Sequence, residues 1–247
     1  MEEQTLLPQV PSVRKSITDV FVTPSELFQN LKGTAQAPAL WAIPLIVSAI
    51  LIILTFVAFS VNDSLQAESR EIQQRNLQKM ADEGKITEEQ LEQIEERTES
   101  MGAIRIVFGS IGGIVFLCIY YFAGALFLWL ANKLILKSKI GYVKHLEMYG
   151  VCSWIGVLGN IVALLMMLAF GTMAATPSLS LILIGNYDPA LKLHKFLSAI
   201  NIFSIWQTIV VGIGLSKFSE KPASTGITVA FGLWIAWTLI ISFVSPF

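Results

Sequence analysis

The sequence predicts an all-α polytopic membrane protein, a bundle of five transmembrane helices with a helical hairpin between the first and second spans. Three observations lead to this fold class. Hydrophobic residues make up 54% of the 247 residues and charged residues only 14%, whereas an ordinary soluble domain has roughly 25% charged residues. Eleven of the 18 acidic residues fall between positions 63 and 99. Outside that stretch, apolar runs of about 20 residues match the length that a helix needs to cross a bilayer.

Composition and charge exclude several classes of protein. A net charge of −1 gives no basic surface of the kind that nucleic acid requires, so we expect no nucleic-acid partner. The high hydropathy excludes a water-soluble enzyme and a disordered tail. Cys118 and Cys152 lie in or beside apolar runs, where they are expected to pack as small hydrophobic side chains and not to form a disulfide or a zinc site.

Residues 1–38 are expected to form a polar N-terminal arm without the apolar core of a signal peptide. Thr23, Pro24 and Glu26 match a capping box with proline at the first helical position. Three apolar residues would then share one face of a short helix: Leu27, Phe28 and Leu31. This helix either lies at the membrane interface or simply leads into the first span.

Residues 39–247 are expected to form the transmembrane domain. Five runs are long enough to cross about 30 Å of hydrocarbon at 1.5 Å per residue. They cover approximately residues 40–61, 106–130, 151–175, 199–215 and 227–244. A weaker apolar run at 179–184 is too short to span, and is either re-entrant or interfacial. Four lysines between positions 133 and 144 favour a cytoplasmic N-terminus and an external C-terminus.

Residues 63–99 form an acidic insertion, for which the sequence predicts a helical hairpin outside the membrane. Gly84 interrupts a stretch without proline, and Thr87 and Gln90 form a capping box directly after this break. The two arms are expected to continue the first and second spans as unbroken helices. The hairpin would then be a separable appendage.

Three amides are the main polar side chains within the predicted spans: Asn160, Asn201 and Gln207. No Asp, Glu or Arg occupies a central span position, which argues against an ion-coupled carrier. A buried amide costs free energy unless it finds a partner. We therefore expect these three side chains to form interhelical hydrogen bonds or, alternatively, to line a polar path.

Glycines mark the positions where helices are expected to pack closely. The spacing of Gly109 and Gly113 fits the small-xxx-small pattern, which serves either packing within the chain or homodimerisation. Close packing is also expected at three further glycines: Gly156, Gly159 and Gly212.

The titratable side chains match no known catalytic or metal-binding pattern. His145 lies near Glu147, but neither it nor His194 has a second ligand at a metal-binding spacing. The adjacent acids Glu88 and Glu89 do not fit a calcium loop. We therefore expect no catalytic residue, no cofactor and no metal ion.

Three stretches, taken in order, resemble the Yip family of Ypt/Rab-interacting membrane proteins, and particularly its prokaryotic members. They are VFVTPSELF at 20–28, YGVCSW at 149–154, and NIFSIW followed by GIGL at 201–215. The resemblance implies a five-helix bundle with a cytoplasmic N-terminus, in a prokaryotic cytoplasmic membrane. Eukaryotic members are associated with Rab GTPases through a long arm, and the short arm here implies that Rab partners are absent. The family offers no agreed catalytic residues to carry over.

Together these features favour a non-enzymatic scaffold or membrane-organising protein. Its expected partners are membrane lipids and either another protein or a second copy of the chain. The alternative is a transporter, a channel or a lipid-translocating protein with a polar path between the helices.

Overall fold

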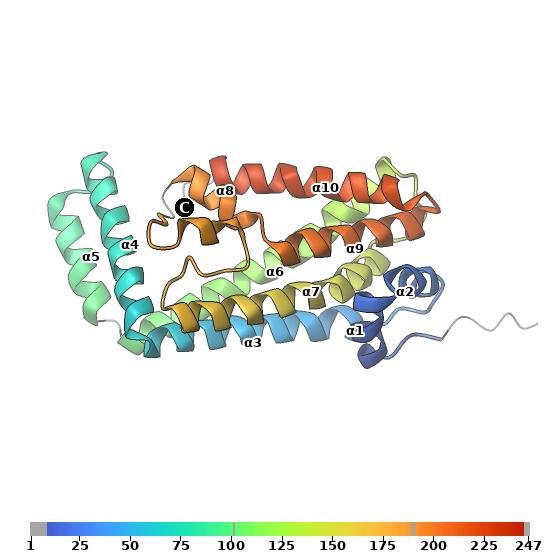
Figure 1. The fold of residues 1–247 in the computed structure, drawn as a ribbon, viewed down its shortest axis with the longest axis horizontal. Coiled ribbons are helices and arrows are strands. Elements are labelled where there is room, and N and C mark those ends of the chain that lie inside the picture. Colours follow the sequence, from blue (N-terminus) through green and yellow to red (C-terminus); the bar gives the residue numbers. More distant parts are fainter. Residues whose placement is uncertain (1–8, 101, 189–190, 245–247) are drawn as a thin grey trace, which may run out of the picture. The chain divides into compact units, whose positions relative to one another are not determined.

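The computed structural model describes residues 9–100, 102–188 and 191–244, which fold mainly into helices (Figure 1). Five helices are long and apolar enough to cross a membrane, as predicted. They are α3 (Ala39–Val61), α6 (Gly102–Leu134), α7 (Tyr142–Phe170), α9 (Ile202–Ser219) and α10 (Ala223–Leu239), the last continuing as a π-helical turn over Ile240–Val244. The shorter helices are α1 (Val13–Val22), α2 (Pro24–Leu31), α4 (Asp63–Asp82), α5 (Glu88–Ser100), a 3-10 helix at Leu179–Leu183, and α8 (Lys192–Ala199).

The chain divides into two compact units. The first contains the residues up to Ser48, Leu117–Gly159 and Ile202–Ile240. The second contains Ala49–Phe116, Asn160–Asn201 and the residues from Ile241 onward. Each unit therefore combines segments that are distant in the sequence.

The first unit has a continuous apolar core. Its buried side chains include Phe28, Leu31, Met148, Ile155 and Leu215. Within it, α9 and α10 lie side by side as a helical pair (Figure 1). Glycines allow the two backbones to approach closely, because a β-carbon added at Gly212 would overlap the backbone of Ile227 on α10.

The N-terminal arm is part of this core. It contains two helices where one was predicted. Ser12 caps α1, and Pro24 occupies the first turn of α2 as expected, but the Thr23 side chain makes no capping hydrogen bond. The predicted apolar face of α2 is fully enclosed, and α2 packs against α9. Protein therefore covers the apolar face of α2, and the position of this helix at the membrane interface stays a prediction.

The second unit contains the α4–α5 hairpin, drawn as an antiparallel pair in Figure 1. Gly84 adopts a φ of +69° at the turn, a conformation that glycine accepts without steric cost. The predicted capping box is present, because the Thr87 amide donates to Gln90 Oε1 at 2.9 Å and the Gln90 amide donates to Thr87 Oγ1 at 3.2 Å. Both features confirm the predicted turn.

The first arm of the hairpin is not a continuation of the first span. Asn62 is extended, with φ −109° and ψ 110°, and its side chain accepts a hydrogen bond from the Leu65 amide, so that α4 starts as a new helix. Residue 101, where the second arm would join α6, lies outside the described residues.

Side-chain contacts tie this first arm to the loop after α7. Leu65 is fully buried. The Glu68 carboxylate accepts hydrogen bonds from the Thr172 hydroxyl at 3.0 Å and the Met173 amide at 2.7 Å. These contacts contradict the expectation of a separable appendage, since the first two turns of α4 are integrated into the second unit.

Candidate functional site

A cluster of polar side chains lies at the start of α7. The helix begins at Tyr142, well before the predicted span start at 151, and its first two turns carry Lys144, His145 and Glu147. Residues three positions apart share a helix face, so Lys144 and Glu147 lie together while His145 points to another side. Their charge made these residues resemble a loop in the sequence.

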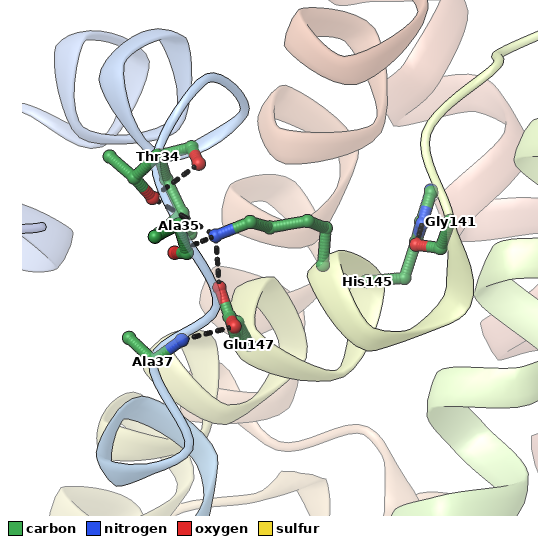
Figure 2. Close-up of polar contacts among 8 residues, drawn as sticks. Thr34, Ala35, Ala37, Gly141, His145 and Glu147 are labelled. Carbon is green, nitrogen blue, oxygen red and sulfur yellow. Dashed lines mark hydrogen bonds and ion pairs between the residues drawn. The ribbon is translucent and has the colours of Figure 1, made fainter. Parts of the chain in front are cut away.

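Lys144 and Glu147 bind the segment that connects α2 to α3 (Figure 2). The Lys144 ammonium lies 2.6 Å from Glu147 Oε2 and donates to Thr34 Oγ1 at 2.9 Å and to the Ala35 carbonyl at 2.7 Å. The Ala37 amide donates to Glu147 Oε1 at 2.7 Å. We call these five residues the arm clasp.

The arm clasp contains a buried ion pair whose charged groups are fully hydrogen-bonded. The side chain of Glu147 is 0% exposed and that of Lys144 is 12% exposed. A buried charge is tolerated when a partner charge and further hydrogen bonds replace the lost water. Here each of the three ammonium protons has an acceptor, and each carboxylate oxygen has a donor. Three of the five residues of the arm clasp belong to the segment between α2 and α3, and they supply hydrogen bonds to the ion pair. The ion pair is therefore fully hydrogen-bonded only when this segment is docked on α7.

His145 fastens the same turn of α7 to α6. Its Nδ1 lies 3.0 Å from the Gly141 carbonyl oxygen and its Nε2 lies 2.7 Å from Nδ2 of Asn132. A carbonyl oxygen only accepts and an amide nitrogen only donates, so the imidazole is the neutral tautomer protonated on Nδ1. Both ring nitrogens are engaged in protein contacts, which leaves neither for a metal ion or a substrate.

Further contacts fix the end of α9 to this region. The Ser138 hydroxyl donates to the Phe218 carbonyl at 2.8 Å. The rings of Phe218 and His145 pack edge to face, with their centroids 5.1 Å apart. Lys32, which follows α2, donates to Glu220 at 2.9 Å. This hydrogen bond and the positive charge of Lys32 lower the pKa of the exposed Glu220 carboxyl below its ordinary value. The arm, α6, α7 and α9 are thus joined at one end of the first unit.

The three predicted amides lie in different settings. Gln207 is half-buried on α9, and its Oε1 approaches Gly156 of α7. Asn201 precedes α9 and forms an isolated β-bridge with Ser178. Asn160 is exposed on α7, and its side-chain amide has no hydrogen-bond partner among the described residues.

The predicted packing glycines lie against neighbouring helices. A β-carbon at Gly109 would stand 2.6 Å from the Phe56 ring, and one at Gly113 would stand 3.0 Å from Ile52. These two glycines therefore pack α6 on α3 within the chain. A β-carbon at Gly159 would lie 2.7 Å from Cβ of Phe203 on α9.

Sequence reasoning missed two glycines and the arm clasp. A β-carbon at Gly226 on α10 would overlap the carbonyl oxygen of Gly212 on α9. A β-carbon at Gly150 would stand 2.5 Å from Cα of Trp41, where α7 crosses the start of α3. In the sequence, His145 and Glu147 stand out as candidate metal ligands, but no second ligand lies at a metal-binding spacing. The signal that points to the arm clasp is instead a Lys-x-x-Glu pair on one face of a helix entering the membrane.

A family model described as the Yip1 domain matches residues 18–245. The chain belongs to the Yip1 domain family. A curated relative, the "Membrane protein YknW" of Bacillus subtilis (strain 168), is 24% identical over 230 residues, covering 92% of this chain and 89% of the relative. No solved structure matches the chain. The Yip1 domain match begins within α1 and extends past α10, so it contains both halves of the arm clasp and the α4–α5 hairpin.

Proposed function

We propose that this Yip1 domain protein is a non-enzymatic membrane scaffold that organises other components through contacts of its arm and its membrane-facing helices. The observation that carries the proposal is the arm clasp. Lys144, His145 and Glu147 lie in the first two turns of α7, and each is engaged in a contact within the fold. Groups that relay protons or bind a coupled ion need access to water or substrate, whereas Glu147 is 0% exposed and Lys144 only 12% exposed.

The docked arm offers a preorganised contact surface. Its apolar face is enclosed in the core, while its outward side exposes polar residues and Val22, which is 71% exposed. A surface that is already ordered loses less conformational entropy when a partner binds. The arm is therefore suited to hold a soluble domain or the polar end of another membrane protein.

Asn160 supplies a second contact point, at the level of the membrane. An amide in hydrocarbon is costly without a partner, and interhelical hydrogen bonds of this kind contribute about 0.6–2 kcal/mol. Its exposed position on α7 favours contact with a transmembrane helix of a partner or of a second copy of the chain.

The proposal is tested by two measurements on the full chain. Purified protein is reconstituted into liposomes, and the rates of lipid scrambling and of solute release are compared with those of protein-free liposomes. In the native membrane, a photo-crosslinking amino acid replaces Val22, with the same replacement at the exposed Lys85 of the hairpin turn as the matched control.

A scaffold is expected to give background rates in the liposomes. It should also give one discrete crosslinked partner from position 22 that is absent from position 85. Lipid or solute flux above background that Asn160→Leu abolishes would overturn the proposal in favour of a conduit. A ladder of crosslinks that is identical at both positions would also overturn it.

A further inference from the structure

Among the five candidate spans of the described chain, α9 is the shortest, with 18 residues, and its apolar part alone does not cover the full hydrocarbon core. The helix covers Ile202–Ser219, and its last turn is polar and carries Lys217. The apolar residues 202–215 would rise about 21 Å at 1.5 Å per residue, whereas the hydrocarbon core is about 30 Å thick. The residues that precede α9 must therefore cover about a third of the hydrocarbon thickness.

The length of α7 points in the same direction, because α7 continues well past the residue that contacts the first turn of α9. Phe203, the second residue of α9, packs on Gly159. From Gly159, α7 continues to Phe170, a rise of roughly 17 Å at 1.5 Å per residue. The chain between α7 and α9 must therefore run back along α7 by a similar distance before α9 begins.

Residues 174–184 of this connection contact the residues that directly precede α9. Ser178 forms an antiparallel β-bridge with Asn201, the residue that precedes α9. Next to the bridge, the Leu179 amide donates to the Ile200 carbonyl at 3.1 Å. The 3-10 helix Leu179–Leu183 follows directly, so it starts beside Ile200 and Asn201, the last residues before α9.

The polar groups of this segment bind one another. The hydroxyls of Thr176, Ser178 and Ser180 lie 2.7–3.2 Å apart, and Ser180 also donates to the Ala174 carbonyl at 3.1 Å. Both serines are buried. Irregular backbone is tolerated within the hydrocarbon only where its polar groups are satisfied internally or line a water-filled cavity. This hydroxyl cluster provides that satisfaction in place of water.

The outer side of the same segment is apolar. Ile182 is 76% exposed, and three neighbouring side chains are 38–44% exposed: Leu179, Leu181 and Ile184. Beyond Gly185 the chain turns polar, and α8 carries Lys192 and Lys195, which suit the phosphate level of the bilayer.

We infer that residues 174–184 are a re-entrant segment inserted into the membrane leaflet on the side of the α4–α5 hairpin, with phospholipid acyl chains as the partner of Ile182 and its neighbours. The juxtaposition of a truncated α9, a self-satisfied hydroxyl cluster and an exposed apolar side carries this assignment. It decides between the re-entrant and interfacial alternatives that the sequence left open, and it does not depend on the proposed scaffold function.

The depth of a nitroxide label tests the inference in the full chain, reconstituted into phosphatidylcholine–phosphatidylglycerol bilayers. Ile182→Cys is labelled in a Cys118→Ser background, where the buried Cys152 is left in place and the background protein alone reports any residual labelling. Power-saturation electron paramagnetic resonance then compares collisions with oxygen, which enters lipid, and with a water-soluble nickel chelate. Ile50→Cys, exposed in the middle of α3, and Lys85→Cys, at the hairpin turn, are the lipid and water references.

The label at position 182 is expected to resemble the label at position 50, with oxygen collisions dominant and a depth below the phosphate level. Collisions dominated by the nickel chelate, as at position 85, would overturn the inference in favour of a surface segment. Shielding from both reagents would also overturn it, because protein would then cover the site. Ile184→Cys provides a second labelling position if the first variant does not fold.

Discussion

Replacing Lys144 by methionine is expected to destabilise the fold by about 3–5 kcal/mol, the usual cost of removing one partner from a buried ion pair. The Glu147 carboxylate is 0% exposed, so in this variant it would stand without its partner in a site that water does not reach. The Ala37 amide would remain as its donor. One neutral hydrogen bond does not replace the ammonium group.

The double variant Lys144→Met/Glu147→Gln should be closer to the wild type. Glutamine keeps an oxygen that accepts from Ala37, and no charge stays buried. The remaining loss is the two hydrogen bonds from the ammonium to Thr34 and Ala35, which we place at about 1–3 kcal/mol. Glu147→Gln alone should cost about 3–5 kcal/mol, because it leaves the Lys144 ammonium without its counter-charge. The coupling energy of the cycle is then about 2 kcal/mol or more.

Titration of the detergent-solubilised protein with SDS, followed by tryptophan fluorescence, measures these free energies of unfolding. Lys139→Met, which removes an exposed lysine of the α6–α7 connection, is the matched control, with an expected change within about 0.5 kcal/mol. If the two single variants simply add in the double variant, or if Lys144→Met is no worse than the control, the arm clasp does not stabilise the protein as argued.

Three further predictions concern other contacts. Gly212→Ala should cost about 1–3 kcal/mol by overpacking α9 against α10, while Gly112→Ala, which meets open space, should gain about 0.5–1 kcal/mol of helix propensity. Glu68→Ala should cost about 1–3 kcal/mol and speed hydrogen exchange in the loop after α7, because two donors lose their acceptor. The pKa of Glu220 is lowered by Lys32, so the pairing of these two side chains stabilises the fold at pH values above the ordinary carboxyl pKa. This stabilisation is lost as the pH falls through the lowered pKa. Lys32→Met should therefore raise the titration midpoint of Glu220, as measured by NMR of its carboxyl carbon.

Each of these predictions has a contrary result. Equal stabilities of the two alanine variants would show that the two helices are not in tight contact. Unchanged exchange in the loop would show that the first arm of the hairpin is not fastened there. A titration midpoint that Lys32→Met leaves in place would show that the ammonium group is not the cause of the shift.

The spans and the hairpin could be predicted because their signals are local. Runs of apolar residues report membrane crossing by length alone, and Gly84 with the Thr87–Gln90 capping box marks a turn within a few residues. The family match agrees with the resemblance carried by three short stretches. For features of this range, composition and spacing contain the necessary information.

The arm clasp could not be predicted, because it joins residues about 110 positions apart. The amphipathic pattern of α2 was correct, but periodicity does not say whether lipid or protein covers an apolar face. The pattern around Lys144 and Glu147 looked like a polar loop, since each charge was evaluated without its partner. The start of α7 was misplaced for the same physical reason.

Hydrogen exchange of the arm in lipid nanodiscs tests most directly whether the arm is a fixed part of the bundle. Amides of residues 16–22 and 27–31 should exchange as slowly as those of α9 in the wild type, and much faster in Lys144→Met than in Lys139→Met. Exchange of the wild-type arm at the rate of the hairpin turn around Gly84 would contradict the account, because the arm would then open independently of the bundle.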